Sequence, residues 1–186
     1  MNFRHRLLTL LLPGLLTVAT AFGAEPVRVL LITGGHDYET NQFLKMFGEN
    51  PGIALETAQH PKAHEWFRAE NAGRYDVIVL YDLWQEITEA AQADFVARLQ
   101  EGKGLVALHH SLANYQKWPV YADIIGGRYY LDKHLEGGVE KPASTYLHDV
   151  QFRVRVEPTP HPVTAGLRDF EIHDETYGGF EVKPGV

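Results

Sequence analysis

Two adjacent histidines, His109 and His110, stand directly after the apolar run Gly104–Leu108. In an open α/β sheet, ligands bind just beyond the carboxyl ends of the strands. If Gly104–Leu108 is a central strand, both imidazoles therefore lie at the ligand-binding edge of the sheet. Neutral imidazoles can hold a divalent metal such as zinc, and they can also exchange protons near neutral pH. We therefore expect a histidine-centred site at this point of the chain.

Further polar residues are expected at the same edge of the sheet. Gly35 and His36 follow the apolar run Val27–Thr33, and Asp82 follows the apolar run Tyr75–Leu80. Because the carboxyl ends of parallel strands share one edge, these residues are predicted to lie near the two adjacent histidines. Residues from the second half of the chain can join them, namely His134, Asp174, Glu175 and Tyr177.

Two kinds of chemistry use such a set of side chains. One is a divalent metal, held by imidazoles and a carboxylate, that polarises a carbonyl or hydroxyl group. The other is metal-free acid–base catalysis by a histidine paired with a carboxylate. The catalytic candidates are His109, His110, Asp174 and Glu175, and the substrate-binding candidates are Gly35, His36, Asp82, His134 and Tyr177. The candidate metal ligands are His36, His109 and His134.

Some histidines and carboxylates also have a purely structural interpretation. His110 can point away from the cleft and fill the core, because adjacent residues at a strand end face opposite ways. Asp174 can cap a turn instead of binding substrate. His60 and His64 are four residues apart, a spacing that suits a metal on a helix. A proline between them favours a helix start after His60, so a solvated surface is the preferred interpretation there.

The elements that must position these residues follow a strand–helix–strand pattern. Continuous apolar runs over 27–33, 75–80 and 104–108 are typical of strands buried on both faces, with a further strand over 53–58. Thr88 is suited to cap a helix that runs to about Gln100. This alternation predicts a doubly wound, mostly parallel α/β sheet of the flavodoxin-like kind.

The second half of the chain is less regular. Apolar and polar residues alternate strictly over 148–156, which predicts a half-exposed, antiparallel strand at an edge of the sheet. Residues 118–125 are predicted to form a helix. Residues 131–144 contain glycines and charged residues, and they are interpreted as a long loop of the functional or disordered kind.

Composition limits the classes of function. The chain has 186 residues, of which 45% are hydrophobic and 22% are charged, as expected for one globular domain. It has no cysteine, which excludes disulfides, thiolate ligands and a cysteine nucleophile, and Ser111 lacks the G-x-S-x-G pattern of a serine nucleophile. The net charge of -7 and the lack of a basic stripe argue against a nucleic-acid partner. G-x-G-x-x-G is absent, so NAD is not expected.

The first residues have the features of a secretory signal peptide. Arg4 and Arg6 precede the apolar run 7–18, and Ala19-Thr20-Ala21 resembles a cleavage site. A membrane anchor is less favoured, because the run is shorter than the roughly 20 residues that span a bilayer. We therefore expect residues 1–21 to be removed, leaving a single domain over 26–186. That domain is expected to be secreted or periplasmic and not attached to a membrane.

Six segments together resemble the ThuA-like family, which is associated with trehalose utilisation. They occur in the family's order and cover nearly all of the chain after the signal peptide. They are LLITGGHDYE at 30–39, YDVIVLYD at 75–82, GKGLVALHHS at 102–111, GGRYYLDKH at 126–134, VRVEPTPHPVTAGL at 154–167 and FEIHDETYGGF at 170–180.

The resemblance implies a fold similar to that of class I glutamine amidotransferases. In that fold a nucleophilic cysteine stands on a sharp strand-to-helix turn, and His109 corresponds to it here, so glutaminase chemistry is not implied. ThuA-like relatives are linked to the use of disaccharides, including 3-keto-sugar routes. The family also continues with further strands beyond the point that corresponds to Val186. The domain is therefore expected to be incomplete at its C-terminus.

Three functions fit these observations. The first is a secreted enzyme that acts on a sugar, disaccharide or keto-glycoside by metal-assisted or histidine–carboxylate chemistry, as a hydrolase, lyase or isomerase. The second is a non-catalytic carbohydrate-binding or accessory domain. The third is a structural module whose histidines only complete the core. The expected partner in the first two is a small carbohydrate, and no feature of the sequence indicates an oligomeric state.

Overall fold

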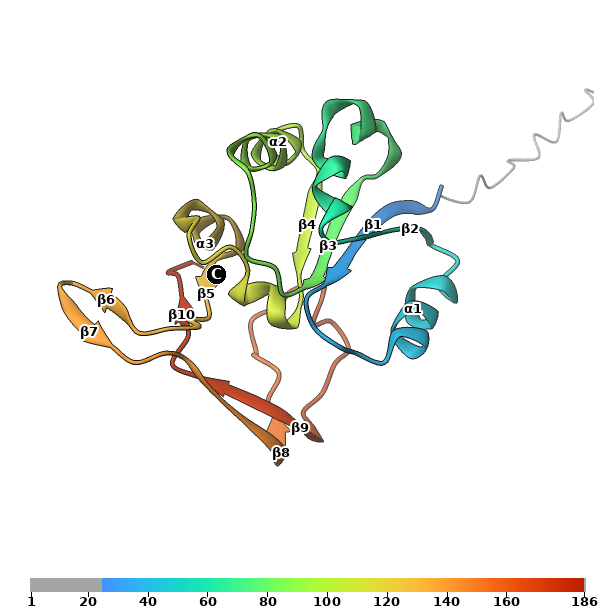
Figure 1. The fold of residues 1–186 in the computed structure, drawn as a ribbon. Helices are drawn as coiled ribbons and strands as arrows, with labels where there is room; N and C mark the ends of the chain where they lie inside the picture. The colour runs from blue at the N-terminus through green and yellow to red at the C-terminus, as the bar shows by residue number, and fades with distance from the viewer. Residues whose placement is uncertain (1–24, 186) are drawn as a thin grey trace, which may run out of the picture.

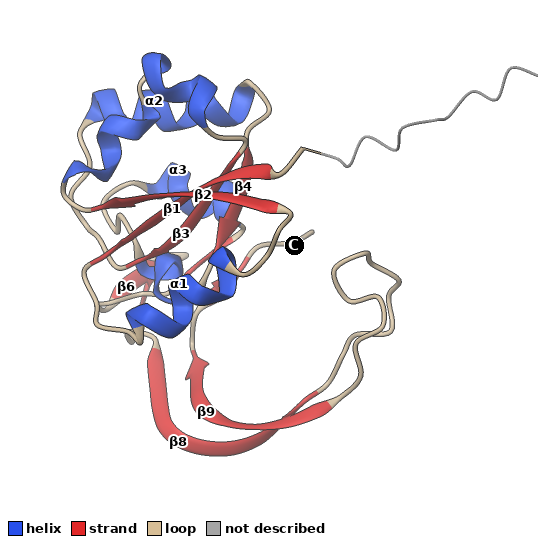
Figure 2. Ribbon diagram, turned by 90° about the vertical axis from the view of Figure 1, so that its right-hand side faces the viewer, coloured by secondary structure: helices blue, strands red, loops and turns tan. Residues whose placement is uncertain are grey.

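A computed structural model describes residues 25–185 of the chain (Figures 1 and 2). The expected signal peptide, residues 1–21, lies outside the described residues. Among those described, no helix combines the length and the apolar character needed to cross a membrane.

A four-stranded parallel sheet forms the centre of the fold (Figure 1). Its strands lie side by side in the order β2 (Ile53–Gln59), β1 (Val27–Gly34), β3 (Val77–Asp82) and β4 (Gly104–Ala107). The register places Leu31 of β1 between Thr57 of β2 and Val79 of β3. All three pairings are parallel, so the carboxyl ends of the four strands meet at one edge. The predicted parallel α/β sheet is therefore confirmed.

Three α-helices accompany the sheet: α1 (Thr40–Gly48), α2 (Glu89–Gln100) and α3 (Pro119–Ile125). The predicted cap of α2 is confirmed, because the side chain of Thr88 accepts a hydrogen bond of 3.2 Å from a backbone N–H in the first turn. α3 starts with proline and ends at Gly126, whose φ of 81° is the left-handed conformation that glycine favours. Short 3₁₀ helices complete the set: η1 (Lys62–Phe67), η2 (Ala69–Arg74) and η3 (His109–Ala113).

Successive residues of β1 are buried on opposite faces of the sheet, which explains why its sequence is continuously apolar. Leu30 and Ile32 belong to the larger core, together with Phe95 of α2. Val29 and Leu31 belong to a smaller core on the other face, where α1 packs. Figure 2 shows α1 and α2 on these opposite faces. The sheet is thus fixed from both sides, which holds the strand ends in place.

The rest of the chain forms three small antiparallel sheets. Each contains two strands, and none is joined to the parallel sheet. The pairs are β5 (Gly127–Arg128) with β10 (Glu181–Val182), β6 (His134–Glu136) with β7 (Val139–Lys141), and β8 (Thr145–Val154) with β9 (Phe170–Gly178).

The structure corrects two expectations about this second half. The segment 131–144, expected to be a loop, contains the β6–β7 hairpin. The strand expected over 148–156 spans Thr145–Val154, and it pairs with β9 and not with an edge of the parallel sheet. Alternation of apolar and polar residues shows that one face of a strand is covered, but it does not identify the partner strand. We call β8 and β9 the arm, because Figure 2 shows them curving away from the sheet.

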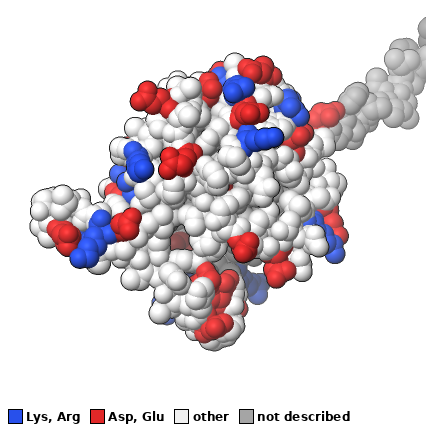
Figure 3. Space-filling view, viewed as in Figure 1, with Lys and Arg blue, Asp and Glu red and all other residues white. Residues whose placement is uncertain are grey.

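Charged side chains are dispersed over the surface. On the face drawn in Figure 3, Lys and Arg are interspersed with Asp and Glu and form no continuous basic stripe. Several are paired, such as Lys183 with Asp123 at 2.8 Å and Lys133 with Glu140 at 3.2 Å. This face therefore offers no strongly charged surface for a polyanion.

Candidate functional site

The two adjacent histidines lie on a sharp turn between β4 and η3. His109 has a φ angle of 53°, in the left-handed region that residues other than glycine adopt rarely. Backbone strain of this kind is concentrated at functional sites. Ser111 helps to close the turn, because its hydroxyl donates a hydrogen bond of 2.8 Å to the carbonyl oxygen of Leu108. The turn presents His109 and His110 beyond the carboxyl end of β4, where the strand pattern predicted them.

His36 arrives at the same place from the end of β1. Its ring centroid lies 4.6 Å from that of His110 and 5.8 Å from that of His109. Its Nε2 lies 3.3 Å from the carbonyl oxygen of Tyr81, and its Nδ1 lies 3.2 Å from that of Asp37. His36 therefore joins the histidine cluster, with both ring nitrogens directed at backbone carbonyls.

The arm contributes a carboxylate to the two-histidine turn. One ligand atom from each of His109, His110 and Glu175 lies within 4.8 Å of the other two. The hydroxyl of Tyr177 donates a hydrogen bond to Glu175 Oε2, and Nδ1 of His148 lies 2.6 Å from Glu175 Oε1. Glu175 is thus held by two neighbours on the arm and faces the histidines from across the site.

These residues line one cavity of about 550 Å³. Its wall is mainly apolar and aromatic, with the polar groups gathered at the histidine turn and Glu175. A further hollow, of about 540 Å³, is lined only by residues between Val156 and Asp169 in the loop that joins β8 and β9. The larger cavity is lined by Leu83, His109, His110, Leu112, Ala113, Tyr129, Leu131, Ser144, Tyr146, His148, Glu175, Tyr177 and Phe180.

The environment keeps the imidazoles neutral and the carboxylate ionised. Burial, together with the neighbouring His109 and His36, lowers the pKa of His110 to about 4. Partial burial and His36 also lower the pKa of His109, although Glu175 opposes this effect. The hydrogen bond from Tyr177 lowers the pKa of Glu175. At neutral pH the group therefore consists of two neutral imidazoles and a carboxylate, which is a donor set that zinc accepts.

The three residues fit a divalent metal with one adjustment. Two histidines and a carboxylate leave a coordination position open, as in catalytic zinc sites. Nδ1 of His110 is buried and has no hydrogen-bond partner among the described residues, which leaves this nitrogen available to a metal. Tetrahedral zinc with nitrogen ligands separates them by about 3.3 Å, so the three ligand atoms would have to draw together by side-chain rotation. The oxygens of Glu175 can accept hydrogen bonds and bind a metal at the same time.

The other predicted site residues have different surroundings. Gly35 has φ of 85°, and a Cβ on it would lie 1.7 Å from the carbonyl oxygen of Leu83, so the glycine permits close backbone packing. Asp82 is fully buried at the end of β3. His134 lies in β6 with its ring stacked on Tyr130, and Asp174 accepts a hydrogen bond of 2.8 Å from the N–H of Glu175. None of these four residues lines the cavity.

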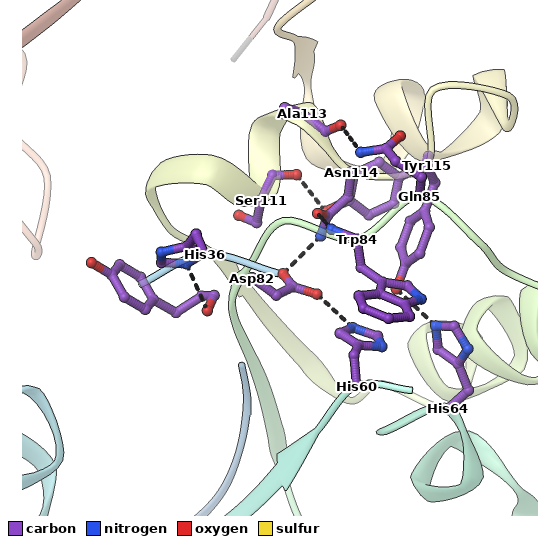
Figure 4. Close-up of polar contacts among 12 residues, drawn as sticks. His36, His60, His64, Asp82, Trp84, Gln85, Ser111, Ala113, Asn114 and Tyr115 are labelled. Atoms are coloured by element: carbon purple, nitrogen blue, oxygen red, sulfur yellow. Dashed lines mark hydrogen bonds and ion pairs between the residues drawn. The ribbon is translucent and has the colours of Figure 1, made fainter. Parts of the chain in front are cut away.

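The structure also brings in residues that the sequence analysis missed (Figure 4). His60 was interpreted as a surface residue, and this was wrong, because it is 8% exposed and its Nε2 lies 2.8 Å from Asp82 Oδ2. Nε2 of His64 lies 3.0 Å from the hydroxyl of Tyr115. His60 directly follows β2, so the rule that placed His36 after β1 would also have placed it at this edge. His148 gave no such signal, because it stands inside β8, at an irregularity in the β8–β9 register.

Comparison with known proteins identifies the family and the fold of the chain. Residues 28–186 match the family model ThuA, described as trehalose utilisation. The crystal structure of a ThuA-like protein from Parabacteroides merdae superposes with a TM-score of 0.68 at 21% sequence identity and covers 87% of this chain, which shows a shared fold. This chain spans 65% of the length of that protein. No curated protein matches the chain. Because the family model extends over nearly all of the described residues, the chain belongs to the ThuA family.

Proposed function

We propose that the chain acts on a sugar, disaccharide or keto-glycoside at a divalent-metal site held by His109, His110 and Glu175. The observation that carries the proposal is the convergence of these three ligands at one cavity of about 550 Å³. Membership of a family described as trehalose utilisation supports a sugar ligand. A cavity of this size accommodates a small molecule.

The walls of the cavity favour an uncharged sugar. None of the described residues that line it is Lys or Arg, and Glu175 adds a negative charge. A sugar phosphate or sugar acid would meet no cationic partner here, so its desolvation would not be compensated. Tyr129, Tyr146 and Tyr177 supply aromatic rings with polar tips, which suits the alternating apolar and hydroxyl surfaces of a sugar ring.

Each side chain has a definite part in the proposed chemistry. When bound, a divalent metal would polarise a carbonyl or hydroxyl oxygen of the sugar. Tyr177 and His148 hold the Glu175 carboxylate in its orientation. The lowered pKa values of His109 and His110 keep both imidazoles unprotonated, so they remain available as ligands at neutral pH. His36 packs against His110 without lining the cavity itself.

Sugar binding and turnover test this proposal. The chain is loaded with one equivalent of zinc and mixed with trehalose-type disaccharides or 3-keto-glycosides. Binding is measured by calorimetry, and turnover is measured by product analysis. We expect a neutral sugar to bind, and Glu175→Gln to weaken that binding or abolish turnover. A matched control is Glu140→Gln, since Glu140 lies in the β6–β7 hairpin and pairs with Lys133 outside the cavity.

The outcomes separate the candidate functions. Sugar binding without any turnover would favour the non-catalytic binding domain. Turnover that persists without metal would favour acid–base catalysis by histidine and carboxylate. Binding that is equally strong in Glu175→Gln and in the control would contradict a sugar site in this cavity.

A further inference from the structure

A buried polar network joins the end of β3 to Asn114, the residue that follows η3 (Figure 4). Its centre is Asp82, the last residue of β3, which is 0% exposed. One carboxylate oxygen faces His60 Nε2 at 2.8 Å, and the other accepts a hydrogen bond of 2.7 Å from the side-chain amide of Asn114. Both oxygens of this buried carboxylate are thus engaged by protein groups.

Asn114 joins the end of η3 to the end of β3 and the loop that follows it. It follows η3, the helix that carries His109 and His110, and it is 1% exposed. Its Nδ2 donates to Asp82 at the end of β3, and its Oδ1 accepts a hydrogen bond of 2.7 Å from the N–H of Trp84. The single side chain therefore fixes the end of η3 to the strand end and to the loop behind it.

The orientation of the His60 ring is fixed by its contacts with Trp84 and Asp82. The ring stacks on the indole of Trp84 with centroids 4.9 Å apart and planes 3° from parallel. Its Nδ1 is buried without a hydrogen-bond partner among the described residues. Buried polar atoms usually have hydrogen-bond partners. The ring of His60 therefore keeps an orientation that satisfies Nε2 through Asp82 and leaves Nδ1 without a partner.

Stability alone does not explain such a network. Replacing a buried charged network by apolar residues of similar volume is often neutral or stabilising. What directional hydrogen bonds add is a fixed geometry, and outer-shell partners of metal ligands commonly serve that purpose. The middle of η3 is also tied, because the hydroxyl of Tyr121 donates a hydrogen bond of 2.9 Å to the carbonyl oxygen of Ser111.

We propose that the His60–Asp82–Asn114 network is a positioning device that sets the place of His109 and His110 relative to Glu175. The proposal builds on the proposed metal–sugar site and adds residues that never touch the metal or the sugar. The network ties the end of η3 to β3, while the arm brings Glu175 to the two histidines. The network is predicted to fix the positions of the His109 and His110 rings relative to Glu175.

The test compares Asn114→Ala with Tyr115→Phe. Tyr115 is the next residue and is equally buried at 2%, but its hydroxyl contacts His64 and not the network. Two measurements are made on each full-length variant: the zinc dissociation constant, and the ¹H–¹⁵N spectrum of the histidine rings without metal. We expect Asn114→Ala to weaken zinc binding about 10- to 100-fold and to shift the ring signals of His109 and His110, with neither change in Tyr115→Phe.

Asp82→Asn provides a conservative rescue. An amide at position 82 can accept from Asn114 and donate to His60 if the imidazole changes tautomer, so ring signals and zinc binding should stay near those of the parent chain. If Asn114→Ala does not fold, Asn114→Ser, which keeps a polar atom there, replaces it in the same comparison.

The two proposals fail in different ways. Ring signals of His109 and His110 that are unchanged in Asn114→Ala, at reduced thermal stability, would overturn the positioning role and leave the metal site intact. Zinc binding that is absent from the parent chain would overturn the metal proposal. The metal-free ring signals would still decide the positioning role in that case.

Discussion

His148 Nδ1 lies 2.6 Å from Glu175 Oε1, although the two residues are on different strands of the arm. Tyr177 donates a hydrogen bond to the other oxygen of the same carboxylate. The arm therefore does more than close one side of the cavity, because it holds the Glu175 carboxylate that groups with His109 and His110. The hydrogen bond from Tyr177 is the largest cause of the lowered pKa of Glu175.

Replacing Tyr177 by phenylalanine should raise the pKa of Glu175, because the strongest hydrogen bond to its charged form is lost. The measurement is a ¹³C NMR titration of the glutamate carboxyl group. Zinc affinity should fall about 10-fold, as is typical when an outer-shell partner is removed. Tyr146→Phe is the control, since Tyr146 also lines the cavity but has no hydrogen bond to Glu175 among the described contacts. An unchanged Glu175 titration in Tyr177→Phe would contradict this account of the carboxylate.

Zinc binding should persist to a lower pH than at a site whose histidines have the ordinary pKa of 6.5. Protons compete with a metal for imidazole, and the pKa of His110 is lowered to about 4, while that of His109 is also lowered from its ordinary value of 6.5. We expect the zinc affinity to begin to fall only below pH 6.5 and to fall steeply as the pH approaches 4, the pKa of His110. Calorimetric titrations in buffers of different pH measure this. A loss of affinity centred near pH 6.5 would mean that these imidazoles titrate as they do in water.

His64 should make the stability of the fold depend on pH. Burial and the neighbouring His60 lower the pKa of His64 to about 4 in the folded protein. Between pH 6.5 and 4 the unfolded chain therefore binds more protons than the folded one, so stability falls as the pH drops through that window. After allowance for solvent screening, we expect a loss of about 1 kcal/mol from this residue, visible in urea unfolding.

The matched variants for this effect are His64→Phe and Tyr115→Phe. Both remove the hydrogen bond between the two side chains, but only His64→Phe removes the titrating group. The pH dependence between 6.5 and 4 should therefore become shallower in His64→Phe and stay as in the parent chain in Tyr115→Phe. Equal slopes in the two variants would assign the acid sensitivity to other groups.

Gly35 should tolerate no side chain. A Cβ at this position would lie 1.7 Å from the carbonyl oxygen of Leu83, and φ is already 85°. Gly102 is a matched control, because its φ of 90° is similar but a Cβ there meets no atom within 4 Å. Gly102→Ala should cost only the backbone strain, about 1 kcal/mol, whereas Gly35→Ala should cost well over 2 kcal/mol. Equal losses in the free energy of unfolding would show that the close approach to Leu83 is not maintained.

The parallel sheet and its edge could be predicted because their signals are local in sequence. Strands buried on both faces are continuously apolar, and His36 and His109 stand within three residues of the ends of two such runs. The pairing of β8 with β9 could not be predicted, since alternation is the same whichever strand lies alongside. The place of Glu175 depends on that pairing and on the curvature of the arm, which no short sequence pattern encodes.

Burial of charged groups was the other part that the sequence did not reveal. Asp82 was expected to face a ligand, yet it lies 0% exposed between His60 and Asn114. The sequence shows a carboxylate at a strand end in either case. Only the three-dimensional packing shows whether its oxygens face solvent or protein donors. The same limit led to the interpretation of His60 as a surface residue.

The most direct test of the account is a cobalt or zinc titration of the chain and of three single variants. The account predicts one equivalent of metal per chain, with a visible absorption spectrum for cobalt that indicates four or five ligands. Binding should be lost in His110→Ala and Glu175→Gln and kept in His134→Ala, because His134 stacks on Tyr130 outside the three-residue group. Absence of stoichiometric metal, or binding that depends on His134 and not on His110 and Glu175, would contradict the proposed site.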